Sequence, residues 1–60
     1  PRIDRQRAAS MVKQHYATDK ILSVDLIESK GPPVYRVKIL SPDGVVKIVF
    51  VDGRSGDLFE

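Results

Sequence analysis

Residues 34–56 decide the fold, and they read VYRVKIL-SPDG-VVKIVFV-DGRSG. In the first part, apolar residues alternate with Arg36 and Lys38, which is the period-two pattern of a strand with one buried face. Residues 45–51 are nearly all apolar and rich in β-branched side chains, which also favours a strand. The stretch therefore predicts two strands in succession.

The connection between these strands has the composition of a tight turn, Ser41-Pro42-Asp43-Gly44. Proline suits the second position of a turn, and Gly44 can adopt the positive φ that other residues avoid. Because a connection this short joins antiparallel neighbours, we expect the two strands to form a hairpin.

Upstream of the hairpin, the period of two continues over residues 22–26, where Leu22, Val24 and Leu26 alternate with polar residues. This pattern predicts a third strand. The Gly-Pro-Pro sequence at residues 31–33 separates it from the hairpin, because proline cannot donate to a strand ladder.

The N-terminal segment changes to a helical period. Asp4 is a suitable N-cap, and Ile3 and Ala8 have the spacing of a hydrophobic staple. We expect the helix to end near Ala17, before a turn sequence. One face of this helix carries Ala8, Met11, Val12 and His15.

The predicted fold is therefore α+β, with one N-terminal helix packed on a three-stranded antiparallel meander sheet. Sixty residues support one small core, so residues 1–60 are expected to form a single domain. The face toward the helix is expected to carry Leu22, Val24, Leu26, Tyr35, Val37, Ile39, Val49 and Val51.

The third strand of this sheet is unusual because it is apolar on both faces. As an edge strand it would normally need cover or a partner. Two interpretations stay open: the tail covers it through Leu58 or Phe59, or it forms an interface with a protein partner or a second copy. The residues we expect at such an interface are Val46, Ile48 and Phe50, with Arg36 and Lys38 beside them.

The composition argues against several functional classes. The chain has no cysteine and a single histidine, His15, so we expect no metal site, no cofactor and no catalytic set. No apolar run approaches the length that spans a membrane. We interpret the first residue, proline rather than methionine, as removal of a targeting segment or excision from a longer protein.

The net charge of +2 comes from the N-terminal part, since residues 1–20 carry five of the ten basic residues but two of the eight acidic ones. This density is below that of most nucleic-acid binders, so no nucleic acid is expected. A solvated face is the simpler interpretation, and weak binding of an acidic surface or of a nucleic acid is the less favoured alternative. The basic residues concerned are Arg2, Arg5, Arg7 and Lys13.

Several motifs together make the chain resemble the PepSY domain family. The most specific is Val51-Asp52-x-x-x-Gly56-x-Leu58, and Gly53 and Ser55 are mild departures inside it. The remaining matches are Tyr35-Arg36-Val37, Asp43-Gly44, Val24-Asp25-Leu26, and Ala8 with Val12.

The resemblance implies a non-enzymatic domain that inhibits or restrains peptidases outside the cytoplasm. A periplasmic or secreted location follows from it, as does a protein partner such as a metallopeptidase. Structural docking or self-association, including a homodimer, is the alternative function. The resemblance supplies no catalytic residues.

Asp52 and Gly56 also have a structural interpretation. An aspartate at a strand end can accept hydrogen bonds from the amides that follow it, and Gly56 can supply a positive φ. We therefore expect Asp52 and Gly56, like Asp43 and Gly44, to be structural turn residues. The alternative is that the Asp52 carboxylate contacts a partner.

Overall fold

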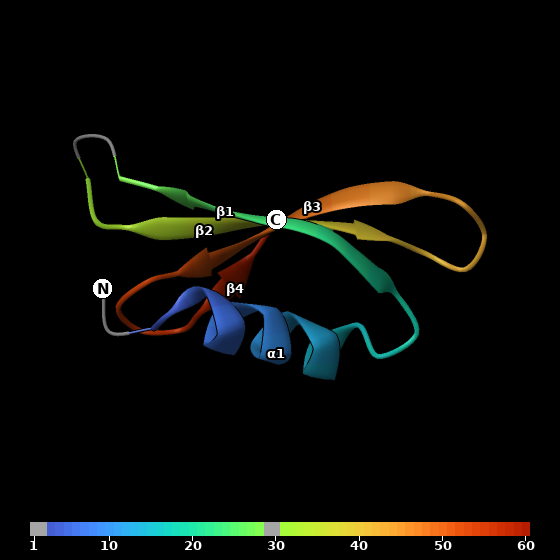
Figure 1. The fold of residues 1–60 in the computed structure, drawn as a ribbon, viewed down its shortest axis with the longest axis horizontal. Helices are drawn as coiled ribbons and strands as arrows, with labels where there is room; N and C mark the ends of the chain where they lie inside the picture. Colours follow the sequence, from blue (N-terminus) through green and yellow to red (C-terminus); the bar gives the residue numbers. More distant parts are fainter. Residues whose placement is uncertain (1–2, 29–30) are drawn as a thin grey trace.

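The computed structural model describes residues 3–28 and 31–60, and it consists of one helix and one antiparallel sheet. The strands lie in the order β1-β2-β3-β4, and α1 lies along one side of them (Figure 1). The predicted helix on a three-stranded meander is confirmed, and a short fourth strand is added to it. Along the chain the elements are α1 (Arg5–His15), β1 (Lys20–Ile27), β2 (Val34–Leu40), β3 (Val46–Asp52) and β4 (Leu58–Phe59).

Local capping fixes both ends of α1. The Asp4 carboxylate accepts a hydrogen bond from the Arg7 amide at 2.7 Å, which satisfies one of the amides that a helix start leaves free. At the other end, the Tyr16 amide donates to the Val12 carbonyl at 2.9 Å. The helix ends at His15, slightly before the expected position, and His15 is exposed.

The core lies between α1 and the inner face of the sheet. Ala8 and Val12 of the helix are fully buried, and so are Val37 and its cross-strand neighbour Val49. Tyr35 is also a core residue, with 3% of its surface exposed. Fully burying a side chain of this kind stabilises the fold by about 1.5–3 kcal/mol, so this small cluster accounts for much of the folding free energy.

A β-bulge corrects the expected orientation of Leu22. Ile21 pairs with Ile39 and Ser23 pairs with Lys38, so Leu22 is the extra residue. The bulge shifts the alternation by one residue, and Ile21 packs against the core while Leu22 is 46% exposed. The prediction that Leu22 faces the helix is therefore wrong.

The tail corrects the expectation that the third strand is an edge along its whole length. β4 pairs with β3 through Phe50 with Phe59 and Val51 with Leu58. The rings of Phe50 and Phe59 stack with their centroids 5.4 Å apart. Tail cover therefore applies to the end of β3, and among the described residues no strand pairs with residues 46–49 on the side of β3 away from β2.

Candidate protein-binding site

The outer face of the sheet, opposite α1, brings together the residues expected at an interface. In one cross-strand row, Arg36 lies between Asp25 and Phe50. In the next row, Lys38 lies between Ser23 and Ile48. In the described part of the chain, no helix covers this side (Figure 1). We call this surface, formed by Arg36, Lys38, Val46, Ile48 and Phe50, the outer sheet face.

The apolar part of the outer sheet face lies on β3. Val46 is 53% exposed, while Ile48 and Phe50 are half-buried. Phe59 extends this apolar surface beyond Phe50, with 47% of its own surface exposed. Sequence reasoning considered Phe59 as cover for the strand but missed it as part of the exposed surface, because a two-residue strand produces no period of its own.

The charged part of the outer sheet face is basic. Arg36 Nη2 lies 3.5 Å from Asp25 Oδ2, and both side chains are about half exposed. An ion pair this accessible to water contributes at most about 1 kcal/mol. Among the described residues, Lys38 is in no ion pair. The face therefore offers a free positive charge beside Ile48.

The loop between β3 and β4 is organised by Asp52. Its carboxylate accepts hydrogen bonds from the amides of Arg54, at 2.8 Å, and Ser55, at 3.2 Å. These bonds lower the pKa of Asp52, because they stabilise the ionised form. The geometry is that of a turn held by an aspartate side chain.

The hairpin turn between β2 and β3 has a similar design. Gly44 has φ +86°, and its amide donates to the Ser41 carbonyl at 3.0 Å. The Ser41 hydroxyl donates to the Asp43 carboxylate, and this hydrogen bond lowers the pKa of Asp43. Both aspartates of the two turns are thus engaged within the chain.

We expect the stability of the domain to fall in acid because of these two carboxylates. A carboxyl pKa that is lower in the folded than in the unfolded protein stabilises the fold above the unfolded pKa, near 4. That contribution is lost as the pH falls through the folded pKa. Urea unfolding between pH 6 and about pH 2 should show this loss, and D43N and D52N should each reduce the pH dependence. An unchanged pH dependence in both variants would contradict the assignment.

The tail makes a further contact with the helix end. The Tyr16 hydroxyl donates to Glu60 Oε2 at 2.8 Å, and this bond raises the pKa of Tyr16. Leu58 packs against the core, so the tail is held on its inner side as well as by the aromatic stack. Tyr16 therefore helps to hold the tail in place, and it is not part of the outer sheet face.

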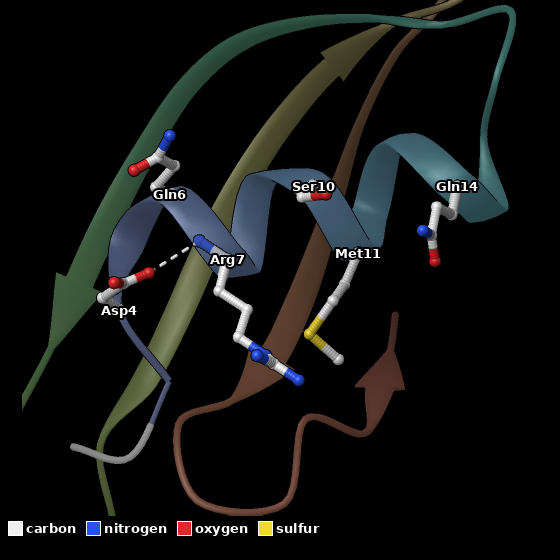
Figure 2. A pocket seen from close by; sticks show the side chains of 6 residues that line it. All are labelled: Asp4, Gln6, Arg7, Ser10, Met11 and Gln14. Atoms are coloured by element: carbon white, nitrogen blue, oxygen red, sulfur yellow. Dashed lines mark hydrogen bonds between the residues drawn. The ribbon is translucent and has the colours of Figure 1, made fainter.

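A depression of about 470 Å³ lies over the exposed side of α1, away from the outer sheet face. Asp4 at its rim is already used as the helix cap, and the Met11 side chain points toward the turn that leads into β4 (Figure 2). The depression therefore brings together no set of groups for chemistry. Its lining residues are Asp4, Gln6, Arg7, Ser10, Met11 and Gln14.

The N-terminal basic residues are partly engaged elsewhere. Lys13 donates to the Asp19 carbonyl at 2.7 Å, whereas Arg5 and Arg7 are exposed on α1. Arg2 lies outside the described residues. The basic side chains of the outer sheet face come from β2, a different element, so the two groups do not belong to one stretch of chain.

The described residues contain neither a metal-binding cluster nor a membrane-spanning helix. Within residues 3–28 and 31–60, no three side chains of the histidine, cysteine, aspartate or glutamate type lie close enough together to hold a metal ion. In the same part of the chain, no helix has the length and apolar character needed to cross a membrane.

Comparison with known proteins places the chain in a family. The sequence profile of the family described as "Peptidase propeptide and YPEB domain", PepSY, matches residues 2–60. No curated protein and no solved structure gives a significant match. PepSY domains are propeptide-like regulatory modules rather than catalytic ones, and the family is generally extracytoplasmic. Because the match covers essentially the whole chain, the protein belongs to the PepSY family.

Proposed function

We propose that this domain is a non-catalytic module that binds and restrains a peptidase outside the cytoplasm, with a metallopeptidase as its partner. Membership of a peptidase propeptide family supports a peptidase-related role. The domain would act by occupying a surface of its partner, since the described residues bring together no nucleophile and base of the kind that catalysis requires.

The observation that carries the proposal is the outer sheet face. A small domain leaves Val46 half exposed, with Ile48 and Phe50 beside it, on the side of the sheet without a helix. Contiguous exposed apolar surface of this kind is typical of protein interaction sites. Lys38 and Arg36 form the polar surroundings that select an acidic partner surface.

Ile48→Lys tests this proposal. Placing a charge in the centre of the apolar surface should weaken inhibition of a thermolysin-like metallopeptidase by at least about 30-fold, which corresponds to the loss of an interface residue worth about 2 kcal/mol. The fold should persist, because Ile48 is on the outer face and is not a core residue. Inhibition constants of the purified variants provide the measurement.

Val45→Lys is the matched control. It introduces the same charge nearby, at a residue that is 47% exposed and precedes β3. Inhibition equal to that of the unmodified protein is expected for this variant. If Ile48→Lys inhibits as well as Val45→Lys, the outer sheet face is not the binding surface.

Self-association is the second candidate function, and the same exposed apolar surface favours it. Two copies packed through the outer sheet face would form a symmetric dimer. Sedimentation over a range of concentrations distinguishes the two functions. A dimer that Ile48→Lys dissociates, with no inhibition of the peptidase, would favour self-association.

A further inference from the structure

The open part of β3, residues 46–49, continues the edge to which β4 is bound. β4 pairs with Phe50 and Val51, at one end of the seven-residue strand. Among the described residues, nothing pairs with the rest of this edge. β4 itself shows that the edge accepts an antiparallel strand and that an aromatic side chain can then lie on the outer face, against Phe50.

The direction of the backbone groups can be assigned from the hydrogen bonds at the end of β3. Asp52 faces the tail, since its amide donates to the Asp57 carbonyl at 2.8 Å and its carbonyl accepts from the Gly56 amide at 2.9 Å. Gly53 faces β2, because its amide donates to the Pro33 carbonyl at 2.8 Å. Successive residues of an antiparallel strand point their backbone groups to opposite neighbours.

This alternation places the amide and carbonyl groups of Phe50, Ile48 and Val46 on the side of β4. On this side Phe50 lies opposite Phe59, whereas no described residue pairs with Ile48 or Val46 there. Their four backbone groups are therefore free to form a ladder. Lys47 and Val49 direct theirs toward Ile39 and Val37 of β2.

We propose that the partner segment binds this edge as an added strand, antiparallel to β3 and in line with β4. This inference rests on the proposed function and specifies how the partner is held. Backbone hydrogen bonds supply affinity in this mode of binding, while alternate side chains supply specificity.

The side chains beside the edge define the chemistry of the segment. Residues opposite Val46 and Ile48 would lie on the outer sheet face, against apolar side chains, so they should be apolar. The residue opposite Lys47 lies on the other face, where an acidic side chain would find an exposed ammonium group near the Asp43 carboxylate. The segment that fits is extended and alternates apolar with acidic residues.

Amide hydrogen exchange, followed by NMR, tests the inference on the unmodified protein. The probe is a short peptide in which valine and glutamate alternate. It should slow exchange at Val46 and Ile48 by about tenfold or more, while Lys47 and Val49 change little because their amides already bond to β2. The same peptide with N-methylated backbone amides should have no effect.

Three results would overturn the inference. The peptide fails to bind at millimolar concentration, or it binds without slowing exchange at Val46 and Ile48. The third result is that exchange at these amides slows as the protein concentration rises, without any peptide. It would mean that the edge pairs with a second copy of this chain.

Val46→Pro and Val46→Ala separate the backbone from the side chain. Proline at position 46 removes the amide that points away from β2, and it removes no hydrogen bond between β2 and β3. Proline is tolerated at positions of this type on an edge strand. We expect Val46→Pro to weaken peptide binding about tenfold or more and Val46→Ala to retain it. Thermal unfolding shows whether each variant folds. The exchange experiment uses the unmodified protein, so its result holds even if a variant does not fold.

The peptidase assay distinguishes failure of this inference from failure of the proposed function. In one outcome, Ile48→Lys abolishes inhibition of the peptidase and Val46→Pro does not. This result would overturn the added strand and would leave the proposal of a peptidase-binding domain standing. In the other outcome, the unmodified protein does not inhibit the peptidase, but the peptide still slows amide exchange at Val46 and Ile48. This result would overturn the proposed function and would leave the edge of β3 as a peptide-binding site.

Discussion

Gly56→Ala should remove about 2–3 kcal/mol from the free energy of unfolding. Gly56 has φ +83°, a conformation that costs other residues about 1–2 kcal/mol. A β-carbon at this position would also lie 2.6 Å from Met11 Cε and 2.9 Å from Ile3 Cδ1. Both atoms are the outer ends of side chains that can rotate, so moving them adds only about 1 kcal/mol. The free energy of unfolding of a domain of this size is about 3–9 kcal/mol, so the variant should lose a substantial part of its stability.

Gly44→Ala is the control that isolates the packing contribution. Gly44 has φ +86°, almost the same as Gly56, but a β-carbon there would have no atom within 4 Å. Urea unfolding should therefore show a loss of about 1–2 kcal/mol for Gly44→Ala. Equal losses in the two variants would mean that the contact between the turn and α1 contributes nothing.

Gly53→Ala should cost about 2–4 kcal/mol, for a different reason. Its β-carbon would lie 2.8 Å from the Pro33 carbonyl oxygen, and a backbone atom cannot rotate away as a side chain can. Gly53 also donates to Pro33 and accepts from the Ile3 amide at 3.1 Å, so a shift would weaken two hydrogen bonds, each worth about 1 kcal/mol.

Gly31→Ala is the matched variant for this prediction. A β-carbon at Gly31 would meet no atom of the described residues within 4 Å, so the unfolding free energy of this variant should stay within about 0.5 kcal/mol of the unmodified protein. Thermal and urea unfolding of both variants provide the comparison. A Gly53→Ala protein as stable as Gly31→Ala would show that β2 and β3 can separate at this point without cost.

The fold could be predicted because its local signals agree with one another. The alternation around Arg36 and Lys38, the turn at Pro42 and the cap at Asp4 each favoured the element that forms. Leu22 was misplaced because a bulge leaves the composition unchanged while shifting the alternation by one residue. β4 was missed because two residues cannot display a period, and its pairing depends on the turn at Gly56.

The residues of the candidate site could be placed on one face from the period of two alone. Ile48 and Lys38 are cross-strand neighbours, as the hairpin turn requires. The contribution of Phe59 depends on contacts between distant parts of the chain, which no local pattern encodes. The direction of each backbone amide likewise depends on register, which the structure supplies.

If the sheet adds a partner strand as proposed, the bulge at Leu22 would limit how many molecules it can recruit. A sheet with two uninterrupted edges can add identical neighbours on both sides and grow into a filament, because such contacts do not close. β1, the strand at the other edge, has the bulge in its pairing with β2 and begins with the exposed Lys20, and both features hinder pairing with a further strand. Recruitment at β3 would therefore end after one partner, giving complexes of fixed stoichiometry.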